Sequence, residues 1–153
     1  GNTNKKYIIG EDSGLMVLSK YPINFIAEDI LEDLQWPDSM ALKTNLYFSV
    51  GKLNFVTTHL QSGYEDISKK QLIKLFDKSP VNSFIILGDL NNSDACNILN
   101  LPVNNICNTC ENAILDYILP VNYENLNLSV NVLNININNT SDHLPIFGEI
   151  KSP

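Results

Sequence analysis

Four short polar segments lie beside or inside apolar runs, and the two histidines of the chain fall in two of them. The segments are Thr57–Gln61, Gly88–Asn91, Leu115–Ile118 and Ser141–Pro145. Short apolar runs of this kind are typical of strands buried in a sheet. Because each run carries a side chain that titrates or binds metal, the pattern predicts several strands that bring their ends to one site.

The rest of the sequence predicts a strand-rich chain. We expect strands over Gly14–Ser19, Ile23–Ala27, Leu46–Val50, Leu53–Thr57, Phe84–Leu87, Ile114–Leu119, Leu126–Ile137 and Pro145–Ile150. The dipeptide Gly51-Lys52 separates two of them and suits a type II′ hairpin turn, which favours glycine at its first position. Strands that outnumber helices in this way indicate an α/β or α+β class with packed sheets, in a single domain over residues 1–153.

One long helix is expected over Glu65–Lys78. Apolar residues recur there at helical spacing, and the lysines lie largely on the opposite side. The apolar stripe consists of Ile67, Leu72, Ile73, Leu75 and Phe76. Ser79-Pro80 should end the helix, because proline cannot continue the helical hydrogen bonds. A second, shorter helix is expected over Asn92–Leu99.

Composition narrows the choice of partners. The chain has 153 residues, a net charge of −7 and no arginine. It therefore lacks the basic surface that binds duplex DNA, and phosphate must be held by lysine, histidine, asparagine, backbone N–H groups or a metal. No apolar run approaches the roughly 20 residues that span a bilayer, and no signal peptide is visible. The sequence does not indicate a cellular location.

The three cysteines leave two alternatives open. Cys107 and Cys110 have the spacing of a metal-binding or redox pair, while Cys96 stands alone. No second pair accompanies them, so ordinary thiols in a reducing compartment are favoured over a zinc or redox site.

Spacing within the polar segments indicates how their side chains face. Residues two apart in an extended strand point to one side, so Asp89 should share a face with Asn91, and His59 with Gln61. Asp116 lies within an apolar run, where an unpaired carboxylate is costly, so we expect one of the two histidines beside it. Taken singly, each segment also fits an ordinary strand-end turn, a structural histidine or a surface aspartate.

In this order the segments resemble the endonuclease/exonuclease/phosphatase superfamily of metal-dependent phosphoesterases. Gly14–Ile23 is similar to its "GLxxLSKYPI" strand and Thr58–Gln61 to its "THLQ" strand. Gly88–Asn91 resembles its "GDxN" motif, Leu115–Ile118 its "xDYI" motif and Ser141–His143 its closing "SDH" motif. The wording is nearest to neutral sphingomyelinases and related small phosphodiesterases. The resemblance covers nearly the whole chain and implies a DNase I-like, four-layer α/β/β/α sandwich of two packed mixed sheets.

The resemblance also implies roles in the hydrolysis of a phosphodiester. His143, oriented by Asp116, is expected to act on the attacking water or to brace the phosphoryl group. Asp89 is expected to position or deprotonate the nucleophile, and Asn91 to hold a phosphate oxygen. His59 is expected to donate to a non-bridging oxygen as charge develops there. The substrate implied is a nucleic acid, a nucleotide or a phospholipid headgroup.

The cofactor implied is Mg²⁺ or Mn²⁺, with Asp142 and Asp89 as ligands. The superfamily also places an asparagine and a metal-binding glutamate of a "QE" motif before the first of these strands. Only thirteen residues precede Gly14, and Glu11 and Asp12 do not match that motif. We therefore expect a domain that is short at its N-terminus. It is either a metal-dependent phosphoesterase or a catalytically impaired remnant or binding module with the same fold.

The short N-terminus leads to one further expectation. In the resembled fold, upstream strands and a helix complete one sheet, and the polar residues before Gly14 do not replace them. The edge of that sheet should therefore expose unpaired backbone and an apolar patch. We expect the isolated chain to self-associate through this uncovered edge.

Overall fold

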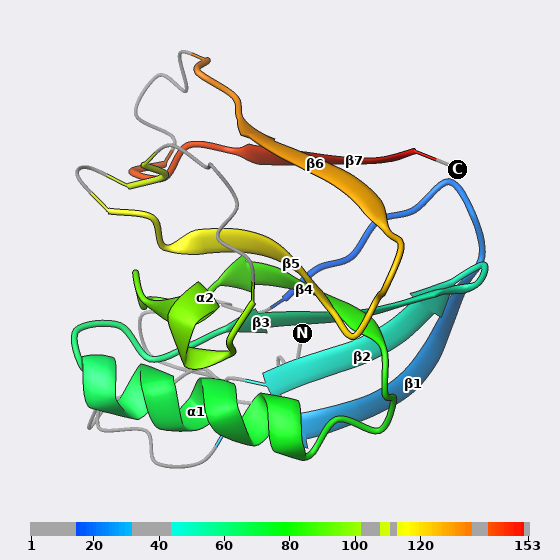
Figure 1. The fold of residues 1–153 in the computed structure, drawn as a ribbon, viewed down its shortest axis with the longest axis horizontal. Helices are drawn as coiled ribbons and strands as arrows, with labels where there is room; N and C mark the ends of the chain where they lie inside the picture. The colour runs from blue at the N-terminus through cyan, green and yellow to red at the C-terminus, as the bar shows by residue number, and fades with distance from the viewer. Residues whose placement is uncertain (1–14, 32–43, 102–107, 111–112, 136–140, 152–153) are drawn as a thin grey trace, which may run out of the picture.

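The computed structural model describes residues 15–31, 44–101, 108–110, 113–135 and 141–151. They contain β1 (Ile23–Ile30), β2 (Thr44–Val50), β3 (Leu53–His59), α1 (Glu65–Asp77), β4 (Phe84–Asp89), α2 (Ala95–Ile98), β5 (Asp116–Val121), β6 (Asn127–Val132) and β7 (Ile146–Lys151). The strands form a five-stranded and a two-stranded sheet, which confirms the predicted mixed α/β class (Figure 1). Within the predicted strand Leu126–Ile137 the structure contains β6, which ends at Val132. The last two residues of the prediction lie outside the described ranges.

The larger sheet has the order β1-β2-β3-β4-β5. Neighbouring strands are antiparallel except β3 and β4, which run parallel and are connected through α1, as a parallel pair requires. The predicted hairpin of β2 and β3 is confirmed, with Val50 opposite Leu53. Gly51 begins its turn with a φ of +58°, a conformation that glycine adopts without strain.

The main core lies between α1 and one face of this sheet. Leu72 and Leu75 of α1 are fully buried in one cluster with Val56, Ile86 and Leu119 from three strands. Burial of each such side chain contributes about 1.5–3 kcal/mol relative to exposure. Neither of the two described helices has the length and apolar content that crossing a membrane requires.

The buried face of α1 differs from the predicted apolar stripe. Ile73 and Phe76 are 40% and 36% exposed, whereas the polar residues Ser68 and Gln71 are buried. Gln71 Oε1 accepts a hydrogen bond of 2.9 Å from the backbone N–H of Gln61, in the loop after β3. The rotation of the helix is therefore set by hydrogen bonds to a loop as well as by apolar contacts.

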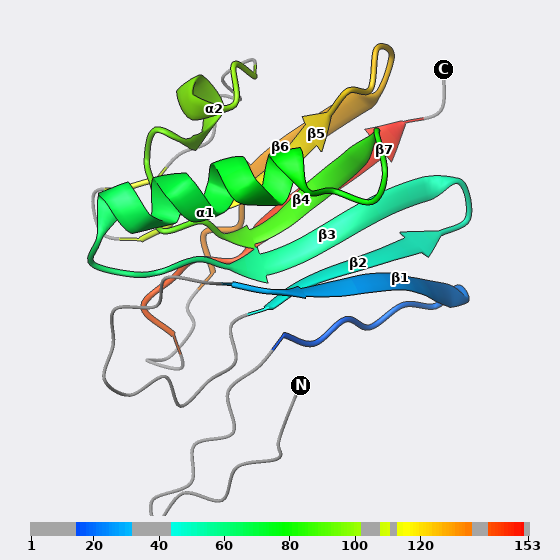
Figure 2. The same cartoon turned by 90° about the horizontal axis from the view of Figure 1, so that it is seen from below.

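The two-stranded sheet of β6 and β7 lies on the opposite face from α1 (Figures 1 and 2). At Gly148 of β7, a Cβ atom would lie 2.9 Å from Ile118 Cδ1 of β5, so glycine permits the close approach of the two sheets. On the same face of the larger sheet, the rings of Phe48 and Phe55 stack with centroids 5.3 Å apart. The described residues thus form three successive layers: α1, the larger sheet and the smaller sheet.

The predicted strand Gly14–Ser19 is wrong over the residues that the structure describes. From residue 15 onward it has no strand assignment, and Met16 and Leu18 are 80% and 84% exposed. Leu15 and Val17 are half-buried, so the alternation of a half-buried strand is present without a hydrogen-bond ladder. A run of this kind becomes a buried strand only with neighbouring strands and cover on both faces, which the described residues do not supply.

Candidate active site

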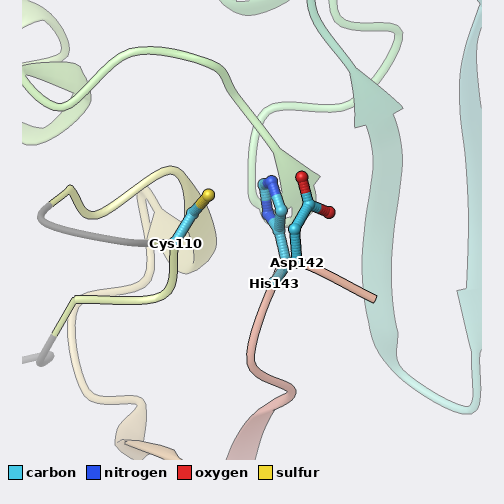
Figure 3. A group of neighbouring side chains, drawn as sticks. All are labelled: Cys110, Asp142 and His143. Atoms are coloured by element: carbon cyan, nitrogen blue, oxygen red, sulfur yellow. The ribbon is translucent and has the colours of Figure 1, made fainter. Parts of the chain in front are cut away.

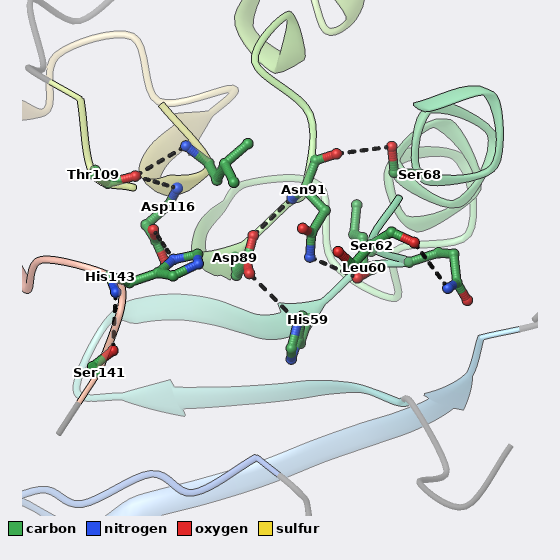
Figure 4. A network of polar contacts seen from close by, with 12 residues as sticks. His59, Leu60, Ser62, Ser68, Asp89, Asn91, Thr109, Asp116, Ser141 and His143 are labelled. Carbon is green, nitrogen blue, oxygen red and sulfur yellow. Dashed lines mark hydrogen bonds and ion pairs between the residues drawn. The ribbon is translucent and has the colours of Figure 1, made fainter. Parts of the chain in front are cut away.

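Three neighbouring strands place titratable side chains at one end of the larger sheet. β3 ends at His59, β4 ends at Asp89, and β5, which runs the other way, begins at Asp116. In the ladder His59 is opposite Asp89, and Asp89 is opposite Asp116. The three side chains therefore form a row at adjacent strand ends (Figure 4), as the sequence predicts.

Gly88 lets β4 approach β3 closely just before this row. Its φ is +141°, which side-chain-bearing residues rarely adopt, and a Cβ atom there would overlap the carbonyl oxygen of Thr58. Beyond the strand ends, the N–H of Leu90 still donates to the carbonyl of Leu115 at 2.8 Å. The backbone around the row is thus fixed on both sides of β4.

Asp89 is held by the turn that follows β4. Asn91 donates its N–H to Asp89 Oδ1 at 2.8 Å and its Nδ2 to the Leu60 carbonyl at 3.0 Å. Its φ of +46° is one that asparagine tolerates better than most residues. His59 Nε2 lies 3.4 Å from Asp89 Oδ2, and the His59 side chain is 52% exposed. His59 is thus the member of the row most accessible to a ligand.

The surroundings of Asp89 oppose its negative charge. Burial raises the pKa of Asp89 above its usual range, and the nearby charge of Asp116 adds to this. The Asn91 N–H and the positive charges of His59 and His143 act in the opposite direction without cancelling the increase. A positive charge placed beside Asp89 would therefore be stabilising.

The predicted pair of Asp116 and a histidine is confirmed. His143 Nδ1 lies 2.7 Å from Asp116 Oδ2, and both side chains are largely buried. Because a carboxylate only accepts hydrogen bonds, the proton of the neutral ring lies on Nδ1 and Nε2 keeps its lone pair. Burial alone lowers the pKa of His143, but the hydrogen bond and charge of Asp116, with Asp89 and Asp142, raise it overall.

Thr109 connects the segments that carry this pair, and no pattern in the sequence singles it out. Its fully buried hydroxyl oxygen accepts the N–H groups of Leu115 and Asp116 at 3.0 and 3.1 Å. Its carbonyl accepts the N–H of Leu144 at 2.7 Å. Thr109 therefore fixes the start of β5 against the segment that carries His143.

A second group of residues missed from the sequence supports the loop after β4. Ser68 Oγ of α1 lies within donating distance of the carbonyls of Glu65, at 3.0 Å, and Asn91, at 3.3 Å, and it accepts Asn92 Nδ2 at 3.2 Å. Gln61 was expected to share a face with His59, but Gln61 is fully buried whereas the His59 side chain is 52% exposed. Ser68 and Gln71 are polar, lie three residues apart on the buried side of α1, and are the only sequence sign of these contacts. A search for a purely apolar stripe does not detect them.

Two groups of side chains among the described residues have the composition and spacing to hold a metal ion. One contains Asp89, Asp116 and His143, and the other contains Cys110, Asp142 and His143. In each group the ligand atoms lie within 4.8 Å of one another. The predicted metal ligands Asp89 and Asp142 therefore fall in different groups, which share His143.

A pocket of about 490 Å³ opens next to the Asp116–His143 pair, between the two sheets. Its lining includes the apolar side chains of Leu87, Ile118, Leu144, Pro145 and Ile146. Asp116, His143 and Ser141 supply polar groups to the same lining. The pair is thus reachable from a space large enough for part of a small ligand.

The sequence matches no protein-family model and no curated protein. A Staphylococcus aureus beta toxin mutant with bound magnesium ions matches the structure with a TM-score of 0.65 and 18% identity, over 87% of this chain and 66% of that chain. Sphingomyelinase C from Streptomyces griseocarneus matches with a TM-score of 0.59 and 16% identity, over 76% and 56%. An endonuclease/exonuclease/phosphatase from Bacteroides vulgatus gives 0.57 and 13%, over 84% and 66%.

These similarities establish the fold. The chain has the DNase I-like fold of the endonuclease/exonuclease/phosphatase proteins, as the sequence motifs indicate. It spans 66% of the length of the beta toxin and 56% of that of the sphingomyelinase.

Proposed function

We propose that this chain carries catalytic residues of a metal-dependent phosphoesterase that hydrolyses a phosphodiester. The observation that supports this most directly is the Asp116–His143 pair at the end of a row with Asp89 and His59. A histidine oriented by a carboxylate, beside further polar groups and an open pocket, is an arrangement suited to proton transfer from water. The fold shared with sphingomyelinase C and with an endonuclease/exonuclease/phosphatase supports the same reaction class, and a beta toxin of this fold has bound magnesium ions.

In this proposal His143 is the general base. With Nδ1 bonded to Asp116, its Nε2 lone pair accepts the proton of the water that attacks phosphorus. The Asp116 carboxylate stabilises the imidazolium that results, in keeping with the raised pKa of His143. Asp89 positions the same water through the remaining lone pairs of its two oxygens, of which Oδ1 accepts the Asn91 N–H and Oδ2 faces His59.

His59 and Asn91 would bind the phosphate group. His59 Nε2 is close to Asp89 yet the ring is half-exposed, so a protonated His59 can donate to a non-bridging oxygen. One N–H of the Asn91 amide is bonded to the Leu60 carbonyl, which leaves the second N–H for a phosphate oxygen. Because the chain has no arginine, histidine and asparagine donors take a larger share in holding the anion, together with lysine, backbone N–H groups or a metal.

The donor set fits a hard divalent cation. Asp89 and Asp116 are adjacent carboxylates, and a cation beside them would offset the burial and repulsion that raise the pKa of Asp89. Oxygen ligands of this kind suit Mg²⁺ or Mn²⁺, which Asp89 and Asp116 would hold. Asp142, the further ligand expected from the sequence, is exposed and falls in the other group, which shares His143. The cation would stabilise the charge that develops on the phosphoryl oxygens.

Charge favours a small or lipid phosphodiester over duplex DNA. The net charge of −7 repels a polyanion at long range. A phospholipid headgroup or a nucleotide brings less charge to the same donors. The substrate class proposed first is therefore a phosphodiester with one phosphate.

The test is hydrolysis with and without metal. The chain is assayed on bis(p-nitrophenyl) phosphate, sphingomyelin vesicles and single-stranded DNA, with Mg²⁺ or Mn²⁺ and then with excess EDTA. We expect hydrolysis only with metal, and faster on the small and lipid substrates. Undiminished rates in EDTA would overturn the metal dependence. Absence of both hydrolysis and Mg²⁺ binding by calorimetry would favour the alternative, a catalytically impaired binding module of the same fold.

A further inference from the structure

Cys110 contributes a thiol to the edge of the proposed active site, where the phosphoesterase reaction has no use for one. Figure 3 shows its side chain on the opposite side of His143 from Asp142. The ligand atoms of Cys110, Asp142 and His143 all lie within 4.8 Å of one another. Cys110 is half-buried, and Asp142 is exposed. A solvent ion can therefore reach the group.

The backbone holds two of these residues opposite each other. Cys110 and His143 form an antiparallel bridge, and the bond from the Leu144 N–H to the Thr109 carbonyl continues it. Cys110 also closes a tight loop by exchanging backbone hydrogen bonds with Ala113, at 2.8 and 3.1 Å. The two side chains are thus brought together by hydrogen bonds that do not depend on a metal.

The ring of His143 has the orientation of a metal-binding histidine. Such histidines usually donate one ring N–H to a carboxylate, which leaves the other nitrogen for the metal. Asp116 supplies that carboxylate at 2.7 Å from Nδ1. The pair that serves proton transfer in the proposed function is equally suited to metal ligation.

The donor types select the metal. One thiolate, one imidazole and one carboxylate suit Zn²⁺, whose bonds to sulfur and nitrogen are about 2.3 and 2.0 Å, with water as a fourth ligand. Tetrahedral bonds of that length place ligand atoms about 3.5 Å apart, so from the 4.8 Å limit a contraction of at most about 1.3 Å is needed. Mg²⁺ prefers oxygen ligands and gains little from the thiol.

We propose that Cys110, Asp142 and His143 form a Zn²⁺ site that competes with catalysis. Zn²⁺ displaces the thiol proton of Cys110 and occupies the His143 nitrogen that would accept a proton from water. It also occupies Asp142, a Mg²⁺ ligand expected from the sequence. The inhibitory effect rests on the proposed function, whereas the binding site does not.

The binding test uses Cd²⁺ and Zn²⁺ on the full chain. Cd²⁺ bound to a thiolate gives an ultraviolet charge-transfer band, and Zn²⁺ is titrated by calorimetry or by competition with Cd²⁺. We expect the band in the parent chain, its loss in Cys110→Ser, and Zn²⁺ affinity lowered at least about tenfold in Cys110→Ser and His143→Gln. The matched controls Cys96→Ser and Cys107→Ser should bind as the parent does. A band that persists in Cys110→Ser, or disappears in Cys107→Ser, overturns the site.

The inhibition test measures hydrolysis by an active preparation, and its result is independent of the binding test. At fixed excess Mg²⁺, low Zn²⁺ should inhibit the parent and Cys96→Ser, while Cys110→Ser keeps its activity at Zn²⁺ concentrations about tenfold higher. Equal inhibition of parent and Cys110→Ser contradicts the competitive role. If no variant hydrolyses any substrate, the proposed function fails while the binding result stands on its own.

Discussion

Phe48 and Phe25 lie opposite each other on neighbouring strands, yet only one of them is buried. They are register partners in β2 and β1, and they are 5% and 68% exposed. The same residue type at the same height of the same face thus meets two environments. On this face of the larger sheet, the side chains are therefore shielded from solvent at β2 but not at β1. The titratable row lies at the ends of β3, β4 and β5, beyond β2 from the exposed strand.

The titratable row lies in the interior of the larger sheet, whereas β1 forms its edge among the described strands. β4 is paired on both sides, whereas β1 has β2 as its only neighbour among the described strands. Exposed apolar side chains gather in and before β1, at Met16, Leu18, Tyr21, Ile23 and Phe25. Such a patch favours association with another surface. Self-association through this edge stays a prediction, and sedimentation velocity measures it.

The largest expected difference is in stability. Phe48→Ala should lower the free energy of unfolding by about 4 kcal/mol, because it removes a buried ring together with its stacking contact to the ring of Phe55. Phe25→Ala should change it by less than about 0.5 kcal/mol, as for other exposed sites. Urea unfolding of both variants measures the contrast. Equal costs would show that Phe25 is covered in solution.

Two glycines should differ in the same way when they are replaced by alanine, because one is packed against a neighbouring strand and the other is not. Gly88→Ala should cost about 3 kcal/mol, since its φ of +141° is strained for alanine and its Cβ would overlap a carbonyl oxygen of β3. Gly51→Ala, in the hairpin, meets open space at a φ of +58° and should cost about 1 kcal/mol. Thermal unfolding compares the two. A cost at Gly88 no greater than at Gly51 would contradict the described packing of β3 on β4.

The third contrast is in activity and depends on the proposed function. His143→Ala should lower kcat/KM by about a hundredfold, or about 2.7 kcal/mol, through loss of the general base. Asp116→Asn should have a similar effect, and the double variant should be little worse than either, because the two act as a unit. Phe25→Ser, far from the row in the ladder, serves as the matched control with unchanged kcat/KM. Additive losses would mean that the two residues act independently.

The smallest effect is on pH dependence. Because the folded pKa of His143 lies above its ordinary value of 6.5, the stability from its pairing is fully present below pH 6.5 and is lost as pH rises through the folded pKa. Asp116→Asn should remove this part of the pH profile. NMR titration of the ring should show the pKa of His143 falling in that variant. A pKa unchanged by Asp116→Asn would argue that other charges maintain it.

The features that could be predicted from the sequence are those determined by short segments of the chain. The Gly51-Lys52 hairpin, the buried strand β4 and the Asp116–His143 pair follow from turn preference, apolar content and the cost of an unpaired carboxylate. The expected roles of all the site residues remain predictions, those of Asp89, Asp116 and His143 included. The structure places Asn91 and His59 at Asp89, and Asp142 beside His143.

What the pattern missed depends on contacts that are distant in the chain. An apolar run at residues 14–19 does not reveal whether neighbouring strands will cover it. The inward side of α1 was misjudged because buried Ser68 and Gln71 find their partners in loops after other strands. Thr109 is one threonine among several, and only its two accepted N–H bonds distinguish it.

Those bonds at Thr109 also determine how the site opens. Its hydroxyl and carbonyl connect the start of β5, the bridge at Cys110 and the segment of His143, so none of these can detach without breaking bonds shared with the others. The amide hydrogens of Leu115, Asp116 and Leu144 should therefore exchange with solvent at similar rates, as one local unfolding unit. Through its hydroxyl and its carbonyl, one threonine thereby makes the loss of the Asp116–His143 geometry an all-or-none event.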